Sequence, residues 1–180
     1  MIIKQTGFEG LVLVSPDVLN DERGYFFESF HKEKFAASEL PVEFEQDNQS
    51  LSHKNVLRGL HFQNPPYEQG KLVRVVNGSL LDVVVDIRKN STTYGKNYSM
   101  VLNAKEQVML WIPAGFAHGF LSLEDNTILS YKCTKVYNKE SESGLLYNDA
   151  DLKIDWNCEN PIVSEKDIKL LHFKSFVSSF

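Results

Sequence analysis

The middle of the chain consists of short apolar runs separated by turn residues, a pattern typical of β-strands. Residues 71–76 form one run and residues 79–87 the next, with an Asn-Gly pair at 77–78 between them. Asn-Gly between two apolar runs is a strong hairpin signal, so we expect these two strands to pair with each other. Side-chain alternation within 79–87 places Asp82 and Asp86 on one face and the odd-numbered valines on the other.

Further short strands follow at regular intervals, each bounded by turn residues. We expect them at residues 97–102, 107–112, 116–123 and 127–134. Many short strands with regular breaks predict an antiparallel sandwich or barrel. Helices are expected only at residues 31–38 and 164–173, the second beginning at Ser164, with Asp167 three residues later as in a capping box.

Composition favours one folded domain over residues 1–180. The chain is 42% hydrophobic and 24% charged, enough for a core and too apolar for disorder. No apolar run is long enough to span a membrane, no secretory signal is visible, and two cysteines make no disulfide framework. We therefore expect a cytoplasmic protein with free thiols. A net charge of -5 argues against a nucleic-acid partner but leaves room for a local anion site.

Two segments concentrate polar residues within apolar sequence. Gly59-x-His61-x-Gln63 and Pro113-x-Gly115-x-x-His118 resemble the paired motifs of the cupin superfamily, whose fold is a jelly-roll barrel. Metal-binding cupins have a second histidine where this chain has Gln63, and only two good ligands can be named. The resemblance therefore implies a mainly β, cupin-type jelly roll without a metal or other cofactor. Either histidine alone has an ordinary alternative role as a hydrogen-bonded core residue.

A histidine, a lysine and a tyrosine suit proton transfer at carbon. A neutral His61 could remove a proton from one face of a substrate while Tyr131 returns one from the other face. Carbon acids are weak, so this chemistry needs a neighbouring carbonyl and a cation such as Lys71 to stabilise the enolate. The alternative role for Tyr131 is that of a core aromatic with its hydroxyl at the rim.

The chain closely resembles the dTDP-4-dehydrorhamnose 3,5-epimerase family, from about Asp21 to Asp167. The matching segments are residues 21–28, 46–48, 56–63, 71–74, 86–88, 112–120, 131–132, 156 and 164–167. The resemblance implies an isomerase that inverts C3 and C5 of a dTDP-linked 4-keto-6-deoxyhexose. It also implies a homodimer that exchanges an N-terminal strand.

The family's roles can be assigned residue by residue from this resemblance. His61 is expected to be the base, with Asp167 holding its imidazole, Tyr131 the acid, and Lys71 the group that stabilises the enolate. Tyr137 is expected to stack on thymine. The other residues expected to bind the nucleotide sugar are Arg23, Glu28, Gln46, Asn48, Arg58, His118, Glu142 and Lys166.

Guanidinium groups suit a diphosphate, which we expect at Arg23 and at Arg58. We also expect Asp82 to orient His118, because alternation turns it inward. Less specific roles stay open for three of the binding residues: Arg23 as a turn residue with a surface ion pair, Glu142 as solvated loop, and Tyr137 as a rim aromatic.

Strand alternation places Arg58 and His61 on opposite faces. They can share a site if Gly59 marks a β-bulge, or one of them can serve a neighbouring subunit. The family's strand exchange likewise implies that Arg23 and Glu28 act in the partner's site.

Three alternative functions remain at this point. The first is an epimerase acting at one carbon or on another nucleotide carrier. The second is a metal-dependent cupin oxygenase using His61 and His118. The third is a non-catalytic sugar-binding module.

Overall fold

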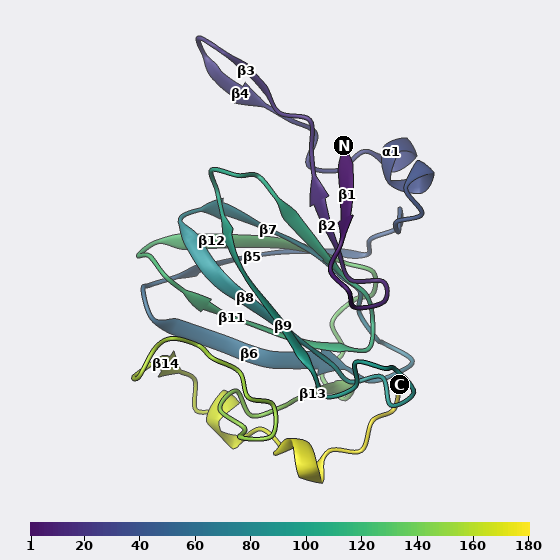
Figure 1. Ribbon diagram of the computed structural model, residues 1–180, viewed down its shortest axis with the longest axis vertical. Helices are drawn as coiled ribbons and strands as arrows, with labels where there is room; N and C mark the ends of the chain where they lie inside the picture. The colour runs from purple at the N-terminus through teal and green to yellow at the C-terminus, as the bar shows by residue number, and fades with distance from the viewer.

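A computed structural model describes residues 1–180, whose main feature is two β-sheets that face each other (Figure 1). The first sheet has the order β1-β2-β10-β7-β12-β5 and contains β1 (Ile2–Gln5), β2 (Val12–Ser15), β5 (Gln46–Ser52), β7 (Lys71–Asn77), β10 (Met109–Ile112) and β12 (Thr127–Cys133). The second has the order β13-β6-β11-β8-β9 and contains β6 (Val56–Gln63), β8 (Ser79–Asp86), β9 (Asn97–Asn103), β11 (Phe116–Ser122) and β13 (Glu142–Gly144), with β14 (Ile162–Val163) parallel to β6. This is the expected jelly roll.

The prediction that the strands on either side of Asn77–Gly78 pair as a hairpin is wrong. Strand β7 pairs with β10 and β12, whereas β8 pairs with β9 and β11, so the Asn-Gly turn carries the chain from one sheet to the other. Gly78 has a φ of +77°, and a Cβ there would lie 2.6 Å from the hydroxyl oxygen of Thr127. The sequence signal identified the turn correctly, but each strand finds its hydrogen-bonding partners elsewhere along the chain.

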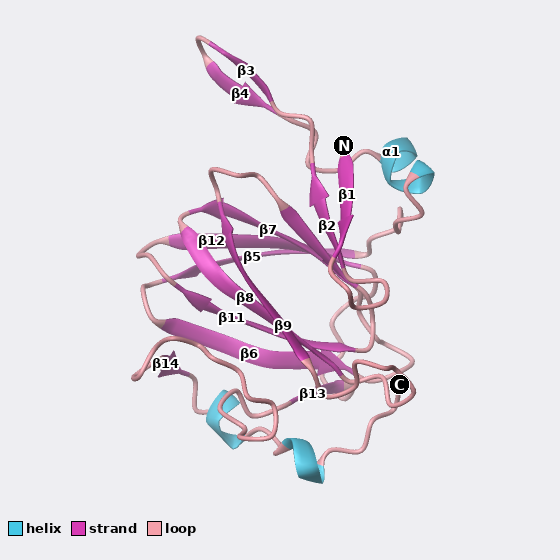
Figure 2. Cartoon of the chain, viewed as in Figure 1, coloured by secondary structure: helices cyan, strands magenta, loops and turns pink.

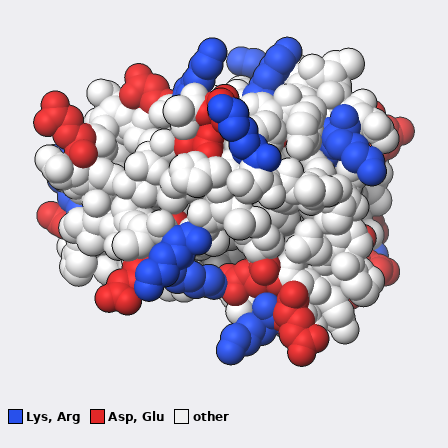
Figure 3. Space-filling view, turned by 90° about the horizontal axis from the view of Figure 1, so that it is seen from below, with Lys and Arg blue, Asp and Glu red and all other residues white.

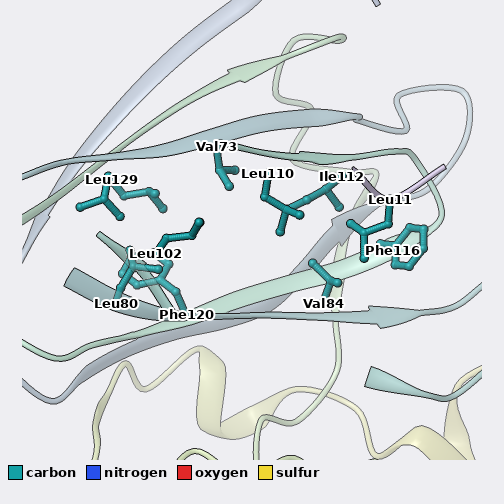
Figure 4. Packing of buried hydrophobic residues seen from close by; sticks show 11 residues of the cluster. Leu11, Val73, Leu80, Val84, Leu102, Leu110, Ile112, Phe116, Phe120 and Leu129 are labelled. Carbon is teal, nitrogen blue, oxygen red and sulfur yellow. The ribbon is translucent and has the colours of Figure 1, made fainter. Parts of the chain in front are cut away.

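Apolar side chains from both sheets meet between them to form the main core (Figure 4). Its members are Leu11, Val73, Val75, Leu80, Val84, Leu102, Leu110, Ile112, Phe116, Phe120 and Leu129. Val83 and Val85, on the other face of β8, pack in a second cluster with Leu152 and Trp156 of the C-terminal segment. Because that segment covers the outer face of β8, both faces of the strand are buried, and the Asp82 face is the one turned toward the interior.

The expected C-terminal helix is replaced by two short 3₁₀ turns, η1 (Asp167–Lys169) and η2 (Phe173–Ser175). The hydroxyl of Ser164 accepts the backbone N–H of Asp167 at 3.1 Å, which is half of the expected capping box. The Asp167 carboxylate does not return to the Ser164 backbone. It bonds to His61 instead, so a tertiary contact replaces the second half of the box.

A hairpin of β3 (Leu19–Asp21) and β4 (Gly24–Phe26) projects away from the sheets (Figure 1). The short helix α1 (Lys32–Ala37) that the sequence predicted follows it along the chain. Tyr25 and Phe26 in this hairpin are 59% and 63% exposed. Helix makes up little of the chain (Figure 2), and none of it is long and apolar enough to cross a membrane. On the face shown in Figure 3, basic and acidic side chains are interspersed.

Candidate active site

A β-bulge in β6 brings two of the expected site residues to one cavity. Along the β6–β11 ladder His61 lies opposite His118 and Arg58 opposite Phe120, so two residues of β6 face one of β11. Gly59 lies in this bulge with a φ of +131°, a backbone conformation that other residues rarely adopt. The expected bulge is therefore confirmed. It shifts the side-chain alternation by one residue, so Arg58 and His61 line the same cavity.

The imidazole of His61 is held by Asp167. The Nε2 atom of His61 lies 2.8 Å from Oδ1 of Asp167, while Oδ2 accepts the backbone N–H of Gly59 at 3.1 Å. Burial raises the pKa of the Asp167 carboxyl, but the bonds from His61, Gly59 and Ser164 outweigh burial and lower it overall. Asp167 is therefore a carboxylate at neutral pH. It occupies Nε2 and leaves Nδ1 as the nitrogen of His61 that is available to a ligand.

Two adjoining cavities share His61, Lys71 and Tyr131. The first, of about 540 Å³, is also lined by Arg58, His118, Lys166 and Asp167. The second, of about 390 Å³, is also lined by Gln46, Asn48, Tyr137 and Glu142. Both volumes are typical of small-molecule sites. The imidazole, the ammonium and the phenol therefore converge where the two cavities meet, as the resemblance implied.

Lys71 and Tyr131 come from neighbouring strands of the first sheet, β7 and β12. Burial lowers the pKa of Lys71, whose ammonium has no hydrogen bond or ion pair with the protein. Burial also raises the pKa of Tyr131, reinforced by the nearby Cys133 thiol and opposed by Arg58. An unpaired ammonium attracts an oxyanion, and a phenol that stays protonated can act as an acid.

A second histidine–carboxylate pair lies in the wall of the first cavity. Nε2 of His118 is 2.9 Å from Oδ2 of Asp82, and both side chains are almost completely buried. The expectation that Asp82 orients His118 is confirmed. The pair lies directly beside the His61–Asp167 pair, because His61 and His118 are opposite each other in the ladder.

Residues at the rim of the second cavity are joined to one another. Glu142 accepts the Tyr137 hydroxyl at 2.8 Å through one oxygen and the Lys166 ammonium at 2.5 Å through the other. The Tyr137 backbone N–H donates to the side-chain oxygen of Gln46 at 2.6 Å, and the Gln46 amide in turn donates to Asn48 at 2.9 Å. Glu142 is therefore not a freely solvated loop residue. The exposed ring of Tyr137 stands at this rim.

The structure does not bring Arg23 and Glu28 to this cavity. Arg23 lies on the projecting hairpin and pairs with the carboxylate of Asp21, with Nε at 3.1 Å from one oxygen. Glu28 pairs with Lys34 at 2.6 Å. Within one chain Arg23 is thus an exposed turn residue with a local ion pair, and its role in a partner's site stays a prediction.

The residues around the histidines do not fit a metal centre. No three His, Cys, Asp or Glu side chains lie together in an arrangement that could hold an ion. The amide of Gln63 donates to the backbone oxygen of Tyr67 at 2.6 Å, and its oxygen accepts the N–H of Asn138 at 2.7 Å. Gln63 therefore fixes a loop where metal-binding cupins have a histidine, and carboxylates already occupy Nε2 of both His61 and His118.

Ser50 lines the first cavity and was missed by sequence reasoning. Its hydroxyl is buried and has no hydrogen-bond partner. The available signal was alternation, since Ser50 shares one face of β5 with Gln46 and Asn48. The apolar wall residues Phe120 and Leu129 were likewise not identified.

A jelly roll whose cavity holds an imidazole, an ammonium and a phenol defines a cupin-type isomerase, an enzyme that moves protons at a carbon atom. The family model described as dTDP-4-dehydrorhamnose 3,5-epimerase matches residues 5–175, and the chain belongs to this family.

Two proteins of that name and one solved structure, a dTDP-6-deoxy-D-glucose-3,5-epimerase, are similar to this chain. The one from Methanothermobacter thermautotrophicus is 48% identical over 91% of this chain and 89% of its own. The one from Shigella flexneri is 48% identical over 93% of both chains. The crystal structure of the Legionella pneumophila enzyme, in complex with dTDP-4-keto-L-rhamnose, has a TM-score of 0.93 and 40% identity and covers 98% of this chain and 94% of that one.

Proposed function

We propose that this enzyme converts dTDP-4-dehydro-6-deoxy-glucose into dTDP-4-dehydro-rhamnose by inverting C3 and C5. The observation that carries the proposal is the convergence of His61, Lys71 and Tyr131 at the junction of the two cavities, with Asp167 bound to the imidazole. A binding module needs no acid and base together in one cavity. Family membership and the fit to a structure holding a dTDP-linked keto sugar support the same substrate class.

The proposed mechanism uses the C4 ketone to acidify its neighbouring carbons. Nδ1 of His61 takes a proton from one of these carbons, and the Asp167 carboxylate stabilises the imidazolium that forms. The electron pair moves into an enolate whose oxygen is stabilised by the Lys71 ammonium. Tyr131 then delivers a proton to the opposite face of the carbon, which inverts it. Exchange with solvent restores His61 and Tyr131, and the same steps repeat at the second carbon.

The test is product analysis by proton NMR with dTDP-4-dehydro-6-deoxy-glucose. The coupling constants of the product report the configuration at C3 and C5 separately. Inversion at both carbons is the expected result. Inversion at one carbon only would identify a mono-epimerase, and a faster reaction with a UDP-linked sugar would contradict the proposed carrier.

We further infer that two copies of the chain complete each other's sites. In this arrangement the nucleotide lies along the second cavity against Tyr137, and Arg23 and Glu28 come from the partner. The projecting β3–β4 hairpin supports this, since it holds Arg23 away from its own cavity and exposes apolar side chains. The free thiols of Cys133 and Cys158 support a cytoplasmic location.

Mixing two inactive variants tests the exchange. An Arg23→Ala chain keeps His61, and a His61→Ala chain keeps Arg23, so a mixed dimer contains one intact site only if Arg23 acts in the partner. After dissociation and reassociation of an equal mixture, about a quarter of the sites should be active. A mixture that stays inactive although mixed dimers form would contradict the exchange.

A further inference from the structure

We propose that Asp82 is a positioning residue of the active site: one carboxylate oxygen fixes His118, and the other supplies the negative charge that keeps the Lys71 ammonium ionised inside the cavity. The inference deepens the proposed function, and it rests on that function for the role of Lys71. It concerns a buried carboxylate that the proposed mechanism does not otherwise use.

The geometry of Asp82 is unusual for a core carboxylate. Its side chain is inaccessible to solvent, and Oδ2 takes Nε2 of His118 at 2.9 Å. Its other oxygen, Oδ1, is buried and has no hydrogen-bond partner. An unsatisfied buried oxygen on a charged group costs free energy, and the field of a nearby cation can offset part of that cost without direct contact.

Lys71 is the cation that this oxygen can serve. Lys71 lines the cavity beside His118, and no protein group forms an ion pair or hydrogen bond with its ammonium. After burial, the groups whose fields act on it are, from the largest effect to the smallest, the thiol of Cys133 and the carboxylates of Asp82 and Glu142. The other titratable groups lining the two cavities that it joins are Arg58, His61, His118, Tyr131, Tyr137, Lys166 and Asp167.

Asp82 is the most suitable of these counter-charges. Glu142 is already bound by Lys166 and by the Tyr137 hydroxyl, and burial raises the pKa of the Cys133 thiol, which keeps it neutral. Asp82 combines a free oxygen with complete burial, where a charge is weakly screened. Burial lowers the pKa of Lys71, and the Asp82 charge opposes that shift.

The geometry around His118 follows from the same carboxylate. Because Asp82 occupies Nε2, His118 presents Nδ1 to the cavity, where it can accept a hydrogen bond from a sugar hydroxyl in its neutral form. Asp82 would thus set two features of the cavity at once, the orientation of an acceptor and the charge of a neighbouring cation.

The variant Asp82→Asn separates these two effects. Its amide oxygen can still accept from His118, while the negative charge is lost. We expect the protonation midpoint of Lys71, followed by NMR of ¹³C-labelled lysine and assigned with Lys71→Met, to fall by roughly one pH unit. The alkaline limb of kcat/KM should move to lower pH by a similar amount, because Lys71 loses its proton earlier. Asp82→Glu, which keeps the charge, should leave both close to wild type.

Asp86→Asn is the matched control. Asp86 lies on the same face of the same strand and is equally buried, but it binds Arg88, Ser91 and Thr93 away from the cavity. The Asp86→Asn variant should lower the free energy of unfolding without moving the protonation midpoint of Lys71. An unchanged midpoint in Asp82→Asn, or an equal shift in Asp86→Asn, would overturn the proposal.

The titration needs no substrate, so it stays informative if the wild-type enzyme fails to epimerise the sugar, a result that would contradict only the proposed function. If Asp82→Asn does not fold, the double variant Asp82→Asn/Lys71→Met provides the test. Removing the uncompensated cation should restore a folded protein, and failure to do so would contradict the electrostatic coupling between Asp82 and Lys71.

Discussion

Replacing Asp167 by Asn tests how the His61 tautomer is set. In the wild type Oδ2 of Asp167 accepts the backbone N–H of Gly59 at 3.1 Å, and Oδ1 lies 2.8 Å from Nε2 of His61. The backbone N–H can only donate, so the oxygen of Asn must face Gly59. The amide NH₂ then points at Nε2 of His61, which must become an acceptor, and the ring proton moves to Nδ1.

The size of the effect follows from this change. Nδ1 is the nitrogen that the proposed mechanism uses as the base, and a protonated Nδ1 has no lone pair to offer. Fixing the wrong tautomer of a catalytic histidine lowers kcat by about 10⁴-fold. The fold should lose only about 1–2 kcal/mol, because Asn keeps both contacts and loses only the charge-assisted part of one. KM should change little, since the substrate contacts remain.

The assay combines the rate of product formation with thermal unfolding. Asp149→Asn is the matched control, because Asp149 is a buried carboxylate that binds His172 at 2.9 Å and the N–H of Phe173 at 2.9 Å, remote from the cavity. We expect Asp149→Asn to lose stability and keep its kcat. A wild-type rate in Asp167→Asn, or an equal loss of kcat in Asp149→Asn, would refute the tautomer argument.

Two further variants address the cavity wall. Lys71→Met should abolish epimerisation, because the cavity loses the ammonium that stabilises the enolate; product formation at a rate close to wild type, measured by proton NMR, would contradict this. Gly59→Ala should lower the free energy of unfolding by roughly 2–6 kcal/mol, because a Cβ would lie 2.5 Å from Cα of Gly119 at a φ of +131°. The control is Gly7→Ala, which also lies at positive φ but has no atom within 4 Å of the added Cβ. Chemical denaturation should show a clearly smaller loss for Gly7→Ala.

The sequence predicted the individual strands better than their partners. Apolar runs mark where strands lie, and the expected strand 127–134 agrees with β12 (Thr127–Cys133). The Asn-Gly turn at 77–78 marks a change of direction, but a local signal cannot say whether the next strand stays in the same sheet. That choice depends on β10 and β12, which are distant in sequence.

The candidate site was likewise predicted only in part from the sequence. His61, Lys71 and Tyr131 were found from motifs and chemistry, and the bulge at Gly59 followed from a conflict between alternation and a shared site. The change from a C-terminal helix to 3₁₀ turns was not predictable, because Asp167 serves His61 rather than its own helix start. Residues whose signal is only a shared strand face, such as Ser50, need the assembled barrel to be recognised.

Solvent deuterium exchange tests the central claim that His61 and Tyr131 serve opposite faces of the sugar. The wild type in D₂O should yield product labelled at C3 and C5. His61→Ala should incorporate no deuterium, whereas Tyr131→Phe should still exchange protons through His61 and return substrate that is labelled but not inverted. Undiminished labelling and inversion in His61→Ala, or normal inversion in Tyr131→Phe, would contradict the account.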